Sequence, residues 1–321
     1  MKKLFTAILL ASLAAGVFAL PNLIKEEEFG ASAIDNLDFD LSWESIQIKE
    51  THDTTSIEVE TYCNYKKYAP EVSVSGSTLY IESVRKMTGF FSTPTGLSCT
   101  VIVYVPQKKD FDEIFVETSS GDIEIIRPLS AKSEISIKST SGDISSNQGL
   151  FADKINIDTT SGDIEVYNID ADDFTTHSTS GDIEIKKFTG ETGTANSTSG
   201  SISADDYACE YADFESTSGD ISVKKLDCDY FDAECTSGDI TIELKNAPVA
   251  TSSINCTSGS VDLYLPMRAK FSVEVSSNSG TFRDKFNNNR MNPRDSYKMD
   301  YNGGGSTIKL HTSSGNITLD Y

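Results

Sequence analysis

Carboxylates recur at one position of this sequence, directly after a glycine. The six aspartates are Asp122, Asp143, Asp163, Asp182, Asp220 and Asp239. Such side chains could bind Ca²⁺, which takes several oxygen ligands, or hydrogen-bond the backbone of a turn. Elsewhere the same position holds Ser, Thr or Asn, which also bond turns but carry no charge. We therefore expect turn chemistry and no cofactor, with a calcium ladder as the alternative, although the Gly-rich nonapeptide of calcium-binding β-rolls is absent.

No other group of residues matches a catalytic arrangement. The sequence has no Gly-x-Ser-x-Gly, no phosphate-binding loop and no His-Glu-x-x-His. Its histidines, His52, His177 and His311, are scattered and it lacks Cys-x-x-Cys, so no zinc site is expected. An active site should interrupt a repeat, whereas the repeated aspartates are uniform. We expect a protein that is not an enzyme, and a polysaccharide-active β-helix enzyme is the less favoured alternative.

The aspartates belong to a repeat. Ten Ser-Gly pairs are followed by a small polar residue and then, in most cases, by Ile. Successive glycines lie 19–21 residues apart, except for a last interval of 35. They are Gly121, Gly142, Gly162, Gly181, Gly200, Gly219, Gly238, Gly259, Gly280 and Gly315. A period of about 20 residues predicts stacked repeats that share one core.

Within a repeat, apolar and polar residues alternate as they do in β-strands. Ile155 and Ile157 precede Gly162 at odd spacings, whereas Ile164 and Val166 follow it at even spacings. The inward face therefore changes parity, so the chain must turn or bulge at Ser-Gly-Asp. We expect glycine there because such a corner often needs a backbone conformation that a side chain forbids.

One repeat cannot bury its apolar residues alone, and stacking solves this with strand hydrogen bonds between coils that rise about 4.8 Å each. We predict an all-β fold, a single parallel β-solenoid (β-helix) of about ten coils of 19–21 residues. A large antiparallel β-sandwich is the alternative. It is less favoured because hairpin signals such as Asn-Gly do not recur between the strands.

Two regions lie outside the regular repeat, which we place at residues 113–321. Residues 20–112 are rich in strand patterns, and we expect them to cap the first coil, because an uncapped solenoid end is an exposed sheet edge. An insertion at 283–305 is rich in Asn and Gly and locally basic. We expect a surface loop there and propose it as a candidate binding loop. Its basic residues are Arg283, Lys285, Arg290, Arg294 and Lys298.

The six cysteines are an even number in a chain expected to be exported, so disulfides are permitted. Four of them form two pairs at equivalent positions of neighbouring repeats. Equivalent α-carbons in adjacent coils lie about 4.8 Å apart, within the disulfide range of about 4.4–6.8 Å. For these pairs the alternative is free cysteines that replace small inward Ser or Thr residues. The predicted disulfides are Cys209–Cys228, Cys235–Cys256 and, as the remaining pair, Cys63–Cys99.

Residues 1–19 have the pattern of a signal peptide. Lys2 and Lys3 precede an apolar run that ends in the small-x-small sequence Val17-Phe18-Ala19. We predict cleavage after Ala19, and an uncleaved anchor helix is the alternative. No cysteine follows the run and no second apolar run occurs. We therefore expect no lipid anchor, no transmembrane segment in the mature chain, and export to the periplasm, the cell surface or the medium.

The chain is strongly acidic. Its formal net charge is −22, and loss of Lys2 and Lys3 with the leader makes it −24. Such a charge repels nucleic acid and anionic membranes, so neither is an expected partner. We expect the acidity chiefly to keep an extended exported sheet from aggregating.

The Thr-Ser-Gly-Asp-Ile repeats resemble those of the bacterial putative-adhesin family, an exported family of β-helical domains. The likeness covers about residues 34–321 and includes the segment Val101-Ile102-Val103-Tyr104-Val105-Pro106 that precedes the coils. It implies a non-enzymatic secreted or cell-envelope protein that binds an external protein or carbohydrate through a rigid acidic surface. The cysteine pairs and the basic insertion depart from the family pattern. The alternative is a periplasmic scaffold or envelope sensor.

Overall fold

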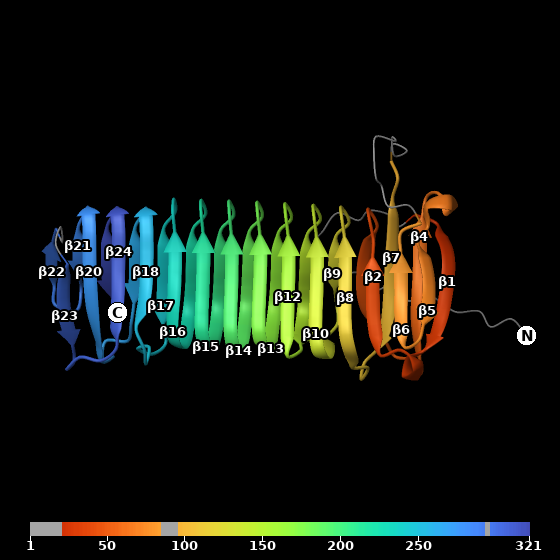
Figure 1. The fold of residues 1–321 in the computed structure, drawn as a ribbon, viewed down its shortest axis with the longest axis horizontal. Helices are drawn as coiled ribbons and strands as arrows, with labels where there is room; N and C mark the ends of the chain where they lie inside the picture. Colours follow the sequence, from red (N-terminus) through yellow and green to blue (C-terminus); the bar gives the residue numbers. More distant parts are fainter. Residues whose placement is uncertain (1–20, 85–95, 293–295) are drawn as a thin grey trace, which may run out of the picture.

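The strands of this chain stack into a long β-solenoid, seen from the side in Figure 1. The structure is a computed structural model that describes residues 21–84, 96–292 and 296–321. Successive coils pair in parallel and in register; Ile183, for example, lies between Ile164 and Ile202. The inward isoleucines, valines and phenylalanines form one continuous core along the rod. The predicted all-β solenoid is confirmed.

The described part of the chain contains twenty-five strands and two short 3₁₀ helices. They are β1 (Leu23–Gly30), η1 (Ala31–Ala33), β2 (Asn36–Asp40), β3 (Ser45–Thr51), β4 (Ser56–Cys63), η2 (Lys66–Tyr68), β5 (Glu71–Ser75), β6 (Thr78–Glu82), β7 (Cys99–Pro106), β8 (Phe111–Thr118), β9 (Ile123–Ile125), β10 (Leu129–Ser139), β11 (Ile144–Phe151), β12 (Lys154–Thr159), β13 (Ile164–Ser178), β14 (Ile183–Ser197), β15 (Ile202–Ser216), β16 (Ile221–Cys235), β17 (Ile240–Leu244), β18 (Ser252–Ser258), β19 (Val261–Tyr264), β20 (Phe271–Ser279), β21 (Phe282–Asp284), β22 (Asn289–Met291), β23 (Tyr297–Tyr301), β24 (Thr307–Ser314) and β25 (Ile317–Asp320).

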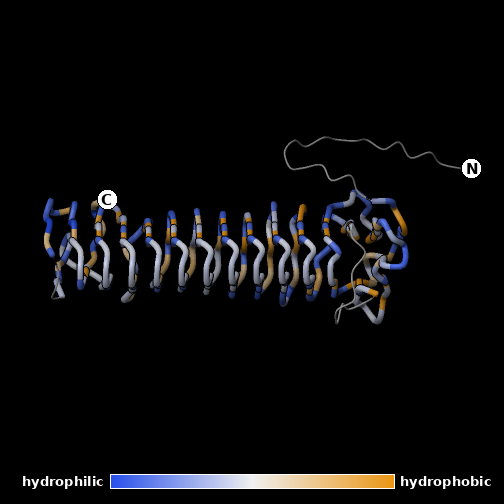
Figure 2. The backbone as a smooth tube through the Cα atoms, turned by 90° about the horizontal axis from the view of Figure 1, so that it is seen from above, coloured by the Kyte–Doolittle hydropathy of each residue, from blue (hydrophilic) through white to orange (hydrophobic). Residues whose placement is uncertain are grey.

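Each coil presents the same sequence pattern to the core, and Figure 2 shows hydrophobic segments recurring at matching places in successive coils. The chain turns at Ser-Gly-Asp, and buried residues lie at odd spacings before the glycine and even spacings after it. Thr159 and Ile164, on either side of Gly162, are both buried. The predicted change of parity is confirmed.

The repeat glycines are needed because neighbouring coils approach closely at the corner. A Cβ at any of these ten positions would lie 1.8–2.4 Å from the carbonyl oxygen of the equivalent residue in the next coil. Only Gly280 among them has a positive φ, of 158°. The expectation that the corner demands a special backbone conformation is therefore wrong. The constraint is the space between coils.

Near the N-terminus, one coil of the stack comes from a segment without the repeat motif. Strands β2 and β3 pair in parallel with β6 and β7 on one side and with β8 and β9 on the other. Glu44 occupies the corner, and its carbonyl oxygen is the atom that a side chain at Gly121 would strike. Beyond this coil, β4 pairs antiparallel with β7, and β1 pairs antiparallel with β4.

The C-terminal end also departs from chain order. The last strands in sequence, β24 and β25, lie between β18/β19 and β20/β21. Part of the insertion then covers the outermost coil, since β22 pairs antiparallel with β21 and β23 with β20. Within the predicted surface loop at 283–305, residues 283–284, 289–291 and 297–301 are paired strand. Without β22 and β23, the outer edges of β20 and β21 would both be unpaired and open to association with other strands.

We predict that Gly200→Ala destabilises the protein by roughly 3 kcal/mol or more, because its Cβ would overlap backbone atoms that cannot move independently of the stack. In the wild type that Cβ position is 2.0 Å from the carbonyl oxygen of Gly181. Urea unfolding followed by circular dichroism measures the change. Gly30→Ala is the control, because nothing lies within 4 Å of a Cβ there. Equal effects of the two substitutions would contradict the close-approach explanation.

Candidate functional site

The repeated aspartates bond the stack together along one corner. In each case Oδ1 of one coil accepts a hydrogen bond, 2.7–3.1 Å long, from the backbone nitrogen of the equivalent residue in the next coil. The acceptors are Asp122, Asp143, Asp163, Asp182, Asp220 and Asp239. The side chains therefore bond backbone as expected, but between coils rather than within one turn.

The same aspartates do not gather into a metal site. Within the described ranges, no three His, Cys, Asp or Glu side chains are grouped to hold a metal ion. One oxygen of each carboxylate is already used by a backbone N–H, which supplies the interaction that offsets repulsion along the row. The calcium ladder remains an alternative that is tested below.

A second row of hydrogen bonds runs inside the corner, through the small residue three positions before each glycine. The hydroxyl of Ser216 accepts from the backbone nitrogen of Gly219 at 2.9 Å and donates to the carbonyl oxygen of Gly200 at 3.2 Å. Cys235 and Cys256 hold this position in their coils, and each thiol lies 3.3 Å from the glycine carbonyl that a serine would reach.

The cysteines are placed as the repeat predicts. Cys63 and Cys99 form a disulfide between β4 and β7. Cys209 lies opposite Cys228, and Cys235 opposite Cys256, in neighbouring coils. These four are free thiols in this structure, so the two solenoid disulfides are not formed here. Burial raises the pKa of Cys209 to about 12 and of Cys235 to about 11, which keeps both thiols protonated and unreactive at neutral pH.

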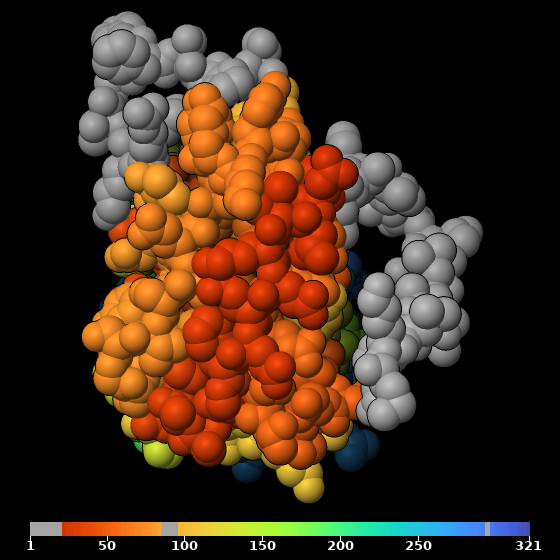
Figure 3. Space-filling model, turned by 90° about the vertical axis from the view of Figure 1, so that its right-hand side faces the viewer, coloured from red at the N-terminus to blue at the C-terminus, as the bar shows by residue number. Residues whose placement is uncertain are grey.

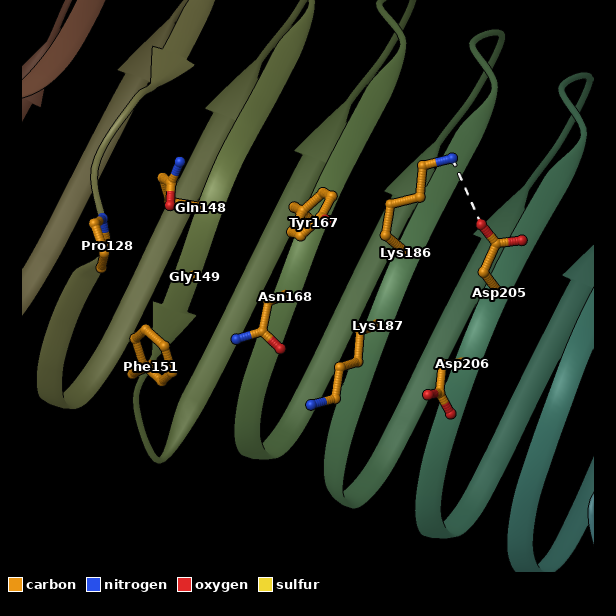
Figure 4. Close-up of a pocket in the computed structure, with 10 residues that line it drawn as sticks. All are labelled: Pro128, Gln148, Gly149, Phe151, Tyr167, Asn168, Lys186, Lys187, Asp205 and Asp206. Atoms are coloured by element: carbon orange, nitrogen blue, oxygen red, sulfur yellow. Dashed lines mark ion pairs between the residues drawn. The ribbon is translucent and has the colours of Figure 1, made fainter.

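An open groove of about 670 Å³ interrupts the regular surface over five successive coils. Figure 4 shows its lining, in which neighbouring coils contribute side chains beside one another along the rod. The groove is lined by Pro128, Gln148, Gly149, Phe151, Tyr167, Asn168, Lys186, Lys187, Asp205 and Asp206. Most of these residues are five or six positions after a repeat glycine and point outward.

One extra residue creates the irregular end of the groove. The pairing of β11 with β13 shifts by one residue between Ser146 and Gly149. After the shift Phe151 lies opposite Asp170, so an aromatic ring replaces a small or acidic side chain at the edge. Gly149 makes room for that ring, because a Cβ there would lie 2.4 Å from it. The bulge thus supplies an apolar wall that the regular repeat lacks.

Tyr167 and a row of paired charges form the rest of the groove. The Tyr167 side chain is 59% exposed. Lys186 lies 3.6 Å from Asp205 (dashed line in Figure 4), and Lys224 lies 3.1 Å from the same carboxylate. The hydrogen bond from Lys224 lowers the pKa of Asp205, so this side chain is charged at neutral pH. Surface pairs of this kind contribute at most about 1 kcal/mol each, so a ligand can rearrange them.

The sequence did not point to this groove. The trace of the bulge in the sequence is one extra residue: the interval from Gly142 to Gly162 is 20 residues long, whereas the intervals that follow it are 19. The predicted loop residues lie at the C-terminal end instead. Arg283 and Lys285 line a second hollow of about 540 Å³ together with Arg290. Lys298 pairs with Glu274 on the opposite side of the coil, 3.0 Å away, and Arg294 lies outside the described residues.

The parallel stack and its open groove define a β-solenoid protein with a polar groove along its side. The chain belongs to the Toastrack DUF4097 family, whose model matches residues 34–169 and 148–320. This confirms the resemblance to bacterial putative adhesins. No protein of curated function matches the chain. In the described ranges, no helix has the length and apolar character needed to cross a membrane.

Several solved structures are similar over most of their length. A "putative adhesin" from Parabacteroides distasonis is 13% identical, with a TM-score of 0.49, over 93% of this chain and 97% of its own. A "putative lipid binding protein" from the same species is 17% identical, with a TM-score of 0.47, over 92% and 96%. A "putative adhesin" from Parabacteroides merdae is 12% identical, with a TM-score of 0.41, over 92% and 95%. At such identities and scores, the fold assignment depends on the strand pairing of this chain.

Substitutions at Asp182 distinguish hydrogen bonding between coils from calcium binding as the role of the aspartate row. Asp182→Ala should cost about 1 kcal/mol, because the Ser201 nitrogen loses its acceptor. Asp182→Asn keeps an acceptor and removes one charge, so its stability should match the wild type. Urea unfolding with and without Ca²⁺ measures both. Calcium that stabilises the wild type but not Asp182→Asn would instead support the calcium ladder.

Proposed function

We propose that this chain is a non-enzymatic adhesin, exported to the cell surface, that holds an external glycan along the groove of Tyr167. The observation that carries the proposal is the exposed tyrosine ring in a groove that runs parallel to the rod. Large exposed aromatic rings beside convergent polar groups are typical of binding sites. A flat ring face can pack against the C–H face of a sugar.

The polar groups around Tyr167 suit a ligand rich in hydroxyls. Gln148 and Asn168 offer amide donors and acceptors, Lys187 offers three donors, and Asp206 accepts. These groups recur from coil to coil at about 4.8 Å, which favours an extended chain over a compact molecule. The groove fits a protein partner less well than a glycan. Stable protein interfaces bury more than about 1,000 Å² around several aromatic anchors, whereas the aromatic residues of this groove are Phe151 and Tyr167.

The proposed organisation supports this function. We propose that residues 1–19 are a cleaved leader; they lie outside the described residues. Residues 20–112 would cap the N-terminal end, and residues 113–321 would form most of a rod of about ten coils of 19–21 residues. The antiparallel pairing of β1 and β4 supports the cap. A stiff rod would hold the groove away from the envelope that anchors or retains the protein.

Location separates an adhesin from a periplasmic scaffold or sensor. We expect protease treatment of intact cells to remove the protein, because an adhesin is exposed outside the outer barrier. A periplasmic marker protein in the same cells is the control and should survive. Protection of both proteins would favour the scaffold.

Tyr167→Ala should lower glycan affinity about tenfold, which corresponds to about 1.4 kcal/mol, while leaving stability unchanged. A glycan array screened with the purified protein would identify the ligand class, and calorimetry would compare the variants. Tyr230→Ala is the control, because Tyr230 is 41% exposed and stacks on Tyr211 outside the groove. Equal losses in both variants would contradict the proposed site. Binding to matrix proteins alone would indicate a protein partner.

A further inference from the structure

Opposite charges face outward at the two ends of the rod. At the C-terminal end, Arg283 of β21 lies directly opposite Arg290 of β22. Like charges in this position repel each other. Neither guanidinium has a carboxylate within ion-pair distance in the described chain. This unneutralised pair stands out in a chain with a formal net charge of −22.

The N-terminal end has the reverse arrangement. Glu26 of β1 lies opposite Glu60 of β4, and Glu28 lies opposite Glu58. Burial, followed by the neighbouring carboxylates, raises the pKa of Glu58. Figure 3 looks onto this end, where the first described residues, in red, cross the face of the rod.

Both charge clusters lie on the same side of the rod, in one row of residues that strand pairing relates to one another, although Ile102 within this row is buried. Pairing relates Glu26 to Glu60, Ile102, Gln47 and Glu124 in turn. From Glu124 the row continues coil by coil to Asp262, Thr318, Arg283 and Arg290. The row therefore begins with two glutamates and ends with two arginines.

Each cluster lies on the outermost described strands of its end. Among the residues that the structure describes, β1 pairs only with β4, and β22 pairs only with β21. The two edges are at opposite ends of the molecule (Figure 1). Charged residues on edge strands commonly prevent unwanted pairing. If both end edges carried charge of the same sign, they would repel every contact between the ends of two copies. Because the two edges carry opposite charge, like ends repel each other and contact between unlike ends, head to tail, stays favourable.

We propose that copies of this chain associate end to end, with the β21–β22 edge of one rod docked on the β1–β4 edge of the next. Arg290 of one copy then lies beside Glu26 of its neighbour, with Arg283 and Glu60 each one strand further from the junction, and the row of paired residues continues across it. The contact joins two different surfaces and does not close on itself, so it extends into a linear chain of rods. Because it depends on charge pairs near the surface, it weakens as salt rises.

Two charge reversals and their mixture test the proposal in sedimentation velocity, with the full chain and with the chain lacking the predicted leader, residues 1–19. Wild type should form larger species as concentration rises at low salt and return to monomer at high salt. Arg283→Glu with Arg290→Glu makes both ends acidic, and Glu26→Lys with Glu60→Lys makes both ends basic. Each double variant alone should associate at least tenfold more weakly than wild type.

An equimolar mixture of the two variants should recover association, because every acidic end again meets a basic end. A variant that had failed to fold could not give this recovery. Lys138→Glu with Lys224→Glu is the control; it changes the net charge as much as the arginine reversal but alters only the middle of the rod, and it should associate like wild type. Monomeric wild type under all conditions, variants that associate like wild type, or a mixture that stays monomeric would each overturn the proposal.

Discussion

The close approach of backbones at the Ser-Gly corner sets the geometry of the whole rod. At this corner the Cβ position of each repeat glycine falls within 2.4 Å of a carbonyl oxygen in the next coil. The corner can be this tight because three sets of bonds meet there. The inward hydroxyls bond glycine nitrogens and carbonyls, the aspartate side chains bond the next backbone nitrogen, and backbone amides such as that of Ile164 bond the next aspartate carbonyl. With the corner fixed, the strands on both sides are held in register.

That constraint explains which substitutions the repeat accepts. A thiol can replace the inward hydroxyl, as at Cys235, because sulfur fills the same small space and still reaches the carbonyl. Serine can replace the aspartate, as at Ser201, because the bond from the preceding coil uses only its backbone. The Ser201 backbone nitrogen still donates a hydrogen bond to the Asp182 side chain. Nothing replaces the glycine within the repeats. The coil of β2 and β3 has Glu44 at the corner in place of the glycine, and on its outer side it pairs with β6 and β7, which do not carry the repeat.

The sequence predicted the regular part of the fold well because strand alternation and a fixed period are local signals. It predicted the register of Cys209 with Cys228 for the same reason. It could not reveal that β24 and β25 lie between earlier strands, because the order of coils in space depends on long-range pairing. It also assigned a loop to residues 283–305, since Asn and Gly suggest turns while the strands there are only three to five residues long. The groove was missed because a bulge of one residue leaves only a small change in period.

A repeat that specifies its interior so strictly leaves its outward positions free, so any specific binding must come from those positions or from departures from the period. Both surfaces proposed here have that origin. The bulge at Gly149 turns Phe151 across the surface and opens a groove next to Tyr167. The long interval between Gly280 and Gly315 supplies β22, which brings Arg290 beside Arg283 at the end of an acidic rod. The groove lies on the side of the rod and the charge pairs lie at its two ends, so end-to-end association would leave every groove open and place many of them along one line.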